Sequence, residues 1–125
     1  MKLSEIMSKA FVVDSEISVK EAAKIMSDKN IGNLIVMRDE KIVGIVTERD
    51  VIKNISSLGS RVSSIMSKNV ITIDKNDSLE NAAELMAEKK IKRLPVLNKG
   101  ELVGIITATD IIANAEDLNE DFFFD

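Results

Sequence analysis

Apolar residues follow two alternating patterns along this chain: short continuous runs and longer stretches with helical spacing. The runs are rich in β-branched residues and end at polar links, which is typical of β-strands. The predicted strands lie at residues 11–13, 33–37, 41–46, 70–73, 93–97 and 101–106. Only the short links 38–40 and 98–100 separate two of the strand pairs, so each of these pairs is predicted to form an antiparallel hairpin.

Helical spacing follows the first strand of each half. Apolar residues recur there at i, i+3, i+4 and i+7, which is one face of an α-helix; they are Val19, Ala22, Ala23 and Met26, and then Leu79, Ala82, Ala83 and Met86. Ser18 with Glu21 forms a predicted capping box, and Ser78 repeats the cap with Asn81 in the Glu position. A second, shorter helix is predicted after Thr47 and another after Thr107.

The order strand, helix, strand, strand, helix occurs twice because the sequence itself repeats. Residues 14–53 and 74–113 are identical at 15 of 40 aligned positions, against roughly 3 expected for unrelated stretches. A lone unit of this size would bury only about 60% of its unfolded surface, so we expect the two units to share a core. The predicted organisation is repeat 1 over 1–59, repeat 2 over 60–115 and an acidic tail over 116–125 that contains Phe122–Phe124.

Composition excludes several classes of function. The chain has 125 residues without His or Cys, so disulfides, thiolate chemistry and common zinc sites are not expected. A net charge of −4 and the lack of Trp and Tyr argue against a nucleic-acid surface. No nucleophile–base pair stands out, so no enzyme activity is predicted. The chain also lacks an apolar run long enough for a membrane span and shows no signal-peptide pattern, which favours a cytoplasmic location.

One motif occurs in both repeats and can carry binding chemistry. Gly44-x-x-Thr47-x-x-Asp50 returns as Gly104-x-x-Thr107-x-x-Asp110, with the Thr at a predicted strand-to-helix junction. A helix start favours an anion, and an ionised Asp can accept both hydroxyls of a ribose. The Gly allows close approach of a ligand or another backbone. The same Thr and Asp spacing is also close to a capping box, so the residues alone leave helix capping and ligand binding both open.

With this motif in both copies, the chain resembles a tandem pair of CBS domains, the module named after cystathionine β-synthase. The Ile91–Val96 stretch and the two Ile-Met-Ser-Lys segments, Ile6–Lys9 and Ile65–Lys68, also match. The resemblance covers residues 1–115. It implies an α/β fold in which the two repeats pack as one pseudo-two-fold module with clefts between them.

The resemblance also implies a regulatory function. Members of the family bind AMP, ADP, ATP or S-adenosylmethionine and pass occupancy to an enzyme, channel or transporter. The expected partners are therefore an adenosine-containing ligand and an unknown regulated protein, with no resident cofactor and no metal. The alternative is a ligand-free interaction module in which the motif residues only cap helices.

The family roles map onto specific positions of this sequence. Asp50 and Asp110 are expected to hold ribose hydroxyls, and Thr47 and Thr107 to contact phosphate. The full set of predicted nucleotide-binding residues is Val12, Thr47, Arg49, Asp50, Ile71, Lys92, Arg93, Pro95, Thr107 and Asp110. Lys92 and Arg93 favour the second copy as the stronger site for a phosphorylated ligand.

The helices carry a further prediction, a homodimer. Ile25 and Leu85 widen the apolar stripes of the two longer helices, and Val51, Ile52 and Ile55 with Ile111 and Ile112 add to the shorter ones. Wide exposed apolar stripes usually mark an interface, and two-fold dimers are the commonest form. Packing of Ile25 and Leu85 within the chain is the alternative.

Overall fold

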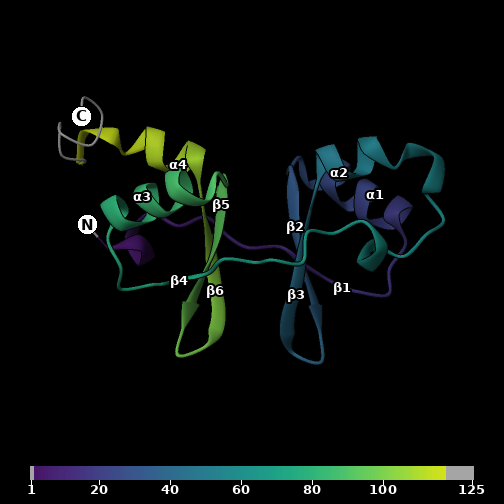
Figure 1. Cartoon of the computed structure of the whole chain (residues 1–125), viewed down its shortest axis with the longest axis horizontal. Helices are drawn as coiled ribbons and strands as arrows, with labels where there is room; N and C mark the ends of the chain where they lie inside the picture. Colours follow the sequence, from purple (N-terminus) through teal and green to yellow (C-terminus); the bar gives the residue numbers. More distant parts are fainter. Residues whose placement is uncertain (1, 118–125) are drawn as a thin grey trace. The chain divides into compact units, whose positions relative to one another are not determined.

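The computed structural model describes residues 2–117, which form two compact units (Figure 1). One unit comprises residues 11–70. The other combines the residues up to 10 with those from 71 onward. Each unit has a three-stranded sheet and helices in the predicted order, which confirms the predicted α/β fold. Most of the predicted tail, including Phe122–Phe124, lies outside the described residues.

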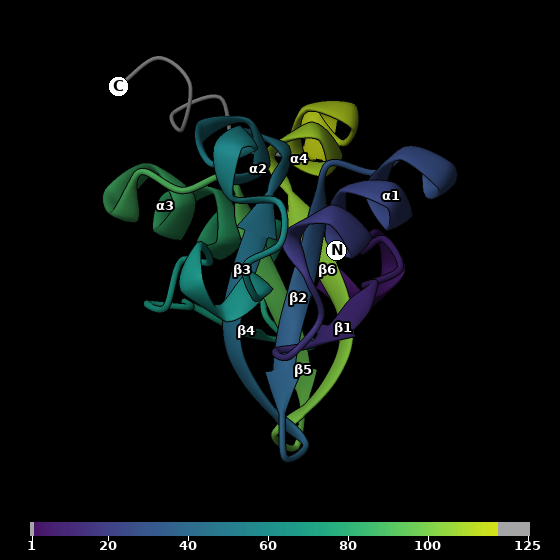
Figure 2. The same cartoon turned by 90° about the vertical axis from the view of Figure 1, so that its right-hand side faces the viewer.

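The unit of residues 11–70 contains β1 (Val12–Asp14), α1 (Val19–Lys29), β2 (Asn33–Arg38), β3 (Lys41–Thr47) and α2 (Glu48–Lys53). Strand β2 is central, parallel to β1 and antiparallel to β3. The β2–β3 hairpin extends beyond the helices of its unit (Figure 2). The predicted apolar face of α1 packs against the sheet, and the buried core consists of Val13, Val19, Ala22, Met26, Leu34, Val36, Val46, Val51 and Val62.

The other unit repeats this architecture with β4 (Ile73–Asp74), α3 (Leu79–Lys89), β5 (Arg93–Asn98), β6 (Glu101–Thr107) and α4 (Ala108–Ala113). Strand β5 is central, parallel to β4 and antiparallel to β6. Its buried core consists of Leu3, Ile73, Leu79, Ala82, Ala83, Met86, Leu94, Val96, Ile106 and Ile111. Short 3-10 turns occupy Leu3–Glu5, Ile55–Ser57, Val62–Ser64 and Ala115–Asp117.

Local side-chain chemistry determines where the longer helices begin. The Ser18 hydroxyl accepts the N–H of Glu21 at 3.0 Å, and the Ser78 hydroxyl accepts the N–H of Asn81 at 3.0 Å. Both Ser oxygens satisfy an amide at the start of the helix, as predicted. The capping box predicted for Ser18 is incomplete, because within residues 2–117 the Glu21 side chain does not accept the N–H of Ser18. The two predicted hairpins are also confirmed. The chain reverses at Asp39 and Glu40 in the first hairpin, where the φ angles of 50° and 64° are those of a tight two-residue turn.

The predicted strand over residues 70–73 is wrong at its start, because β4 contains only Ile73 and Asp74. In the other unit the N–H of Ile35 donates to the carbonyl of Phe11 at 2.9 Å, just before β1 begins. The residue that corresponds to Ile35 is Pro95, which has no N–H. The matching bond to Ile71 cannot form, so the ladder between β4 and β5 is shorter.

Each Ile-Met-Ser-Lys segment packs against the motif of the opposite repeat. Residues 2–10, which open the first repeat, belong to the unit of the second, and residues 61–70 belong to the unit of the first. Leu3 and Val62 are fully buried in these cores. Ser8 pairs with Ile105 of β6, and Ser67 pairs with Ile45 of β3. The segments therefore extend each sheet at the edge that carries the motif glycine.

The longest helices among residues 2–117 have 11 residues each, and none is long and apolar enough to cross a membrane.

Candidate functional site

The repeated Thr and Asp residues form the same hydrogen-bonded arrangement in both units. In the first repeat, Asp50 Oδ2 accepts the backbone N–H of Thr47 at 2.9 Å and its hydroxyl at 3.1 Å. The Thr47 hydroxyl accepts the N–H of Asp50 at 3.3 Å. The corresponding distances for Thr107 and Asp110 are 2.9, 3.0 and 3.1 Å. Each pair is thus a full capping box at the start of its short helix.

The capping box limits what the motif can offer to an anion. Each Thr hydroxyl already donates its single proton to the Asp carboxylate. The first helical amide is also occupied, because the N–H of Ala108 donates to the carbonyl of Lys92 at 2.9 Å and the N–H of Glu48 donates to that of Gly32 at 3.0 Å. A phosphate at these helix starts would therefore depend mainly on charged side chains nearby.

The second oxygen of each Asp carboxylate is free of the cap, and here the two units differ. Asp110 Oδ1 accepts a hydrogen bond from the hydroxyl of Ser8 at 3.0 Å. Within residues 2–117, no side chain or amide donates to Asp50 Oδ1. Both Asp side chains are partly exposed. Asp50 thus presents an unused acceptor, whereas Asp110 presents a partly used one.

The motif glycines are required by the same edge segments. A Cβ on Gly104 would lie 3.0 Å from the carbonyl oxygen of Ser8 and closer still to the Met7 side chain. A Cβ on Gly44 would lie 2.9 Å from the carbonyl oxygen of Ser67 and would overlap the Met66 side chain. Of the two reasons that the sequence offered for a glycine here, the structure shows the close approach of another backbone.

The predicted cations lie close to the motif of their own unit. Arg93 is paired with Thr107 across the β5–β6 ladder, and Lys92 immediately precedes β5. Arg49 lies in the first turn of α2, between Thr47 and Asp50 in sequence. Within residues 2–117, none of the three cationic side chains forms an ion pair or a hydrogen bond. They are therefore available to an anionic ligand.

The predicted apolar residues have different surroundings. Pro95 is fully buried and pairs with Ile105, two positions from Arg93. Val12 is 50% exposed in β1. Ile71 is partly buried against the core of its unit. Its carbonyl has no hydrogen-bond partner in the described chain, since Pro95 cannot donate to it.

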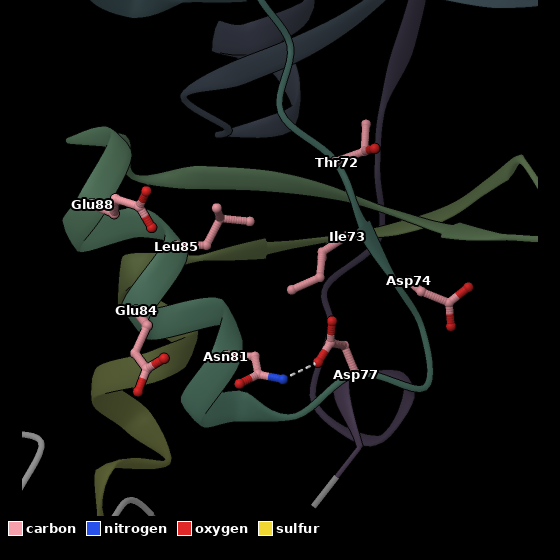
Figure 3. A pocket seen from close by; sticks show the side chains of 8 residues that line it. All are labelled: Thr72, Ile73, Asp74, Asp77, Asn81, Glu84, Leu85 and Glu88. Carbon is pink, nitrogen blue, oxygen red and sulfur yellow. Dashed lines mark hydrogen bonds between the residues drawn. The ribbon is translucent and has the colours of Figure 1, made fainter.

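A hollow of about 390 Å³ lies beside α3 and β4, away from the motif (Figure 3). Its lining residues are Thr72, Ile73, Asp74, Asp77, Asn81, Glu84, Leu85 and Glu88. None of them is a predicted site residue. The amide of Asn81 donates to Asp77 at 2.6 Å (Figure 3). Four carboxylates line this hollow, so it repels the phosphates of a nucleotide.

Comparisons with known proteins identify the family. Residues 3–57 and 62–117 each match the family model of the CBS domain. The chain belongs to the CBS domain family.

Two solved structures of this family are similar in fold and carry adenosine ligands. The CBS domain pair of protein MJ0100, in complex with 5′-methylthioadenosine and S-adenosyl-L-methionine, is 32% identical with a TM-score of 0.84. The alignment covers 93% of this chain and 96% of that one. CBSX2 in complex with AMP is 29% identical with a TM-score of 0.79, over 92% of this chain and 96% of that one.

The curated relatives include an enzyme, inosine-5′-monophosphate dehydrogenase of Thermoplasma acidophilum. It is 38% identical over 108 residues, which is 86% of this chain and 22% of the enzyme. The chain spans about a fifth to a third of the first three curated relatives that it matches, with shares of 22%, 23% and 36%. The similarity is therefore to their CBS portion.

Sequence reasoning missed Ser8 as a neighbour of Asp110. The signal was present, because the Ile-Met-Ser-Lys segment occurs twice. It was assigned to the repeat that follows it, whereas it packs against the motif of the other repeat.

Proposed function

We propose that this chain is a non-catalytic regulatory module that binds an adenosine-containing ligand and passes its occupancy to a partner protein. The candidate ligands are AMP, ADP, ATP and S-adenosylmethionine. The observation that carries the proposal is the free Oδ1 of Asp50, a carboxylate acceptor at the motif of a CBS repeat. Related CBS pairs hold AMP or S-adenosylmethionine, which supports this choice of ligands.

The proposed contacts separate the sugar from the phosphate. Asp50 and Asp110 accept ribose hydroxyls through Oδ1, the carboxylate oxygen that does not take part in the cap. Lys92 and Arg93 hold a phosphate at the second repeat, and Arg49 does so at the first, by charge-assisted hydrogen bonds. Thr47 and Thr107 act mainly by holding the Asp side chain, since their protons are already donated.

The apolar residues are proposed to contact the base. Val12 in one unit and Ile71 in the other offer aliphatic surface. The fully buried Pro95 leaves the carbonyl of Ile71 unpaired, so that this carbonyl can accept the amino group of adenine. The carbonyl of Ile71 is an unused acceptor because Pro95 has no N–H to donate to it. The same missing N–H shortens the ladder between β4 and β5.

A thermal-shift panel with the four candidate ligands tests the proposal. A ligand at 100 times its Kd adds about 2.7 kcal/mol to the free energy of unfolding. The variants Asp50→Asn and Asp110→Asn keep an oxygen for the cap but replace the outward acceptor by an N–H donor. We expect their ligand-free melting points to stay near wild type while ligand-induced shifts fall.

The same panel distinguishes the alternative, a ligand-free interaction module. If the motif only caps helices, none of the four ligands shifts the wild-type melting point. Asp50→Ala and Asp110→Ala then lower the ligand-free stability, by about 0.5–2 kcal/mol for a lost cap, and change nothing else.

A homodimer is proposed on the exposed apolar residues of α2, of the turn that follows it and of α4. Ile52 is 69% exposed and Ile55 is 64% exposed, and Ile112 of α4 is 74% exposed. Ile25 and Leu85, in contrast, pack partly against the core of their own unit, and Val51 and Ile111 are buried in these cores, so these four residues do not belong to an exposed stripe. Light scattering over a dilution series tests the dimer. Ile52→Lys should shift the mass toward one chain, whereas Ser56→Lys, an equal charge on an exposed polar position, should not.

A further inference from the structure

The unequal second oxygens of the two motif carboxylates determine how many ligand hydroxyls each can accept. An ionised carboxylate offers about four acceptor positions on two oxygens. The cap uses both positions of Oδ2 in Asp50 and in Asp110. This leaves two positions on Oδ1 of Asp50, and one on Oδ1 of Asp110 because Ser8 donates to it.

The Ser8 hydroxyl is held at Asp110 by the backbone of its segment. Ser8 N–H donates to the carbonyl of Ile105 at 2.8 Å, and the N–H of Ile105 donates back to Ser8 at 3.0 Å. The hydroxyl must be the donor in its bond to Asp110, since an ionised carboxylate only accepts. This tether gives Ser8 a high local concentration beside the carboxylate, so it competes with any ligand hydroxyl.

Ser67 provides the internal comparison. Its backbone is paired with Ile45 in the same way, at 3.0 and 2.9 Å. Its hydroxyl, however, makes no hydrogen bond to Asp50 in the part of the chain that is described. The two serines thus share a position in the fold but differ in whether they occupy the motif carboxylate.

We propose that Ser8 is an internal competitor at Asp110, which makes Asp110 an acceptor for one ribose hydroxyl and Asp50 an acceptor for two. The inference rests on the proposed binding of adenosine ligands and adds a sugar specificity to each site. The site of Asp50 distinguishes ribose from deoxyribose. The site of Asp110 binds both sugars about equally for as long as Ser8 donates to it.

Calorimetric titration with AMP and 2′-deoxy-AMP tests this assignment. Both probes carry the same base and phosphate, so only the missing hydroxyl differs. Ser8→Ala is the central variant, Ser67→Ala is its matched control, and Ser8→Thr retains a hydroxyl. Ser8 and Ser67 are both exposed, so neither change threatens the fold. Asp50→Asn and Asp110→Asn backgrounds isolate one site at a time.

In the Asp50→Asn background, AMP and 2′-deoxy-AMP should bind with affinities within about twofold. Adding Ser8→Ala should raise the AMP affinity by about 2- to 10-fold, the range of one net hydrogen bond, and should change 2′-deoxy-AMP less. Ser8→Thr should resemble wild type. In the Asp110→Asn background, AMP should bind more tightly than 2′-deoxy-AMP, and Ser67→Ala should leave both affinities unchanged.

Three results would overturn this proposal and leave the proposed function intact. A Ser8→Ala protein that binds AMP more weakly would make Ser8 a ligand contact rather than a competitor. An equal gain for both probes would show that the effect does not involve the second hydroxyl. If Ser8→Ala leaves the AMP affinity at the wild-type value while AMP and 2′-deoxy-AMP bind to the Asp110 site with different affinities, Asp110 does not accept only one ribose hydroxyl. If wild type binds no AMP in calorimetry and no panel ligand shifts its melting point, the proposed function itself fails and this inference fails with it.

Discussion

Asp50 and Asp110 have the same capping geometry but differ in what surrounds their second oxygen. The distances from Oδ2 to the cap donors agree within 0.1 Å, at 2.9 and 3.1 Å in one unit and 2.9 and 3.0 Å in the other. Only Asp110 has the Ser8 hydroxyl on Oδ1. The capping role is thus preserved in both copies, whereas the acceptor left over on Oδ1 differs, so the capping role and the proposed ligand-binding role of the motif can vary independently.

A second difference concerns position 35 and its counterpart, position 95. Ile35 donates its N–H to Phe11 and extends the pairing of β1, while Pro95 has no N–H and leaves the carbonyl of Ile71 without a partner. The second unit therefore loses a ladder bond but gains a free acceptor and two neighbouring cations, Lys92 and Arg93. The unit with the shorter ladder therefore has more groups that could contact the base and the phosphate of the proposed ligand.

The largest effect is expected from Leu3→Ala, which tests whether residues 2–10, the segment that opens the first repeat, pack into the unit of the second repeat. Leu3 is fully buried in the core of the second unit, although it lies at the start of the first repeat in sequence. Truncating a buried Leu costs about 2–5 kcal/mol. Urea unfolding should show this loss, and Ile55→Ala, at a 64% exposed position, should change stability far less. Equal losses for the two variants would contradict the docking of this segment.

Features with local causes were predictable from the sequence, and features with distant causes were not. Ser18 and Ser78 cap helices through residues three positions away, and the short links 38–40 and 98–100 specify hairpins. The same holds for the motif capping boxes, which lie within four residues.

The missed features depend on partners far away in the chain. Ser8 and Asp110 are separated by 102 positions, and a repeat at a fixed offset does not indicate which unit an opening segment joins. The shortening of β4 could have been predicted, since the sequence contains Pro95, which has no N–H. Recognising its effect required knowing that the N–H at this position donates to a carbonyl across a parallel strand pair, as that of Ile35 does to Phe11.

Gly44→Ala and Gly104→Ala should have the next largest effects. Each added methyl would meet a methionine side chain and a backbone carbonyl of the edge segment at 3.0 Å or less. Overpacking of this kind costs about 1–3 kcal/mol. Gly59→Ala is the control, because nothing lies within 4 Å of a Cβ there. Chemical unfolding of the three variants measures the costs. A Gly104→Ala protein as stable as Gly59→Ala would refute the close approach of Met7 and Ser8.

The smallest change in stability is expected from Pro95→Ile, which makes the second unit resemble the first. The new N–H can donate to the carbonyl of Ile71, as that of Ile35 does to Phe11 at 2.9 Å. One hydrogen bond adds about 0.5–1.5 kcal/mol. Removing a proline from the unfolded chain takes back about 0.4–1 kcal/mol. The free energy of unfolding should therefore change by less than about 1 kcal/mol.

The informative measurement on this variant is amide hydrogen exchange by NMR, with the Ile35 amide as the internal reference. We expect the amide of residue 95 to exchange slowly, because it becomes part of a ladder that now extends toward Ile71. AMP binding should weaken at the same time in the Asp50→Asn background, since the carbonyl proposed to accept the adenine amino group is then occupied. Rapid exchange at residue 95 would show that a cause other than the missing N–H shortens β4. Slow exchange with unchanged AMP affinity would remove Ile71 from the proposed base site and leave the explanation of the ladder intact.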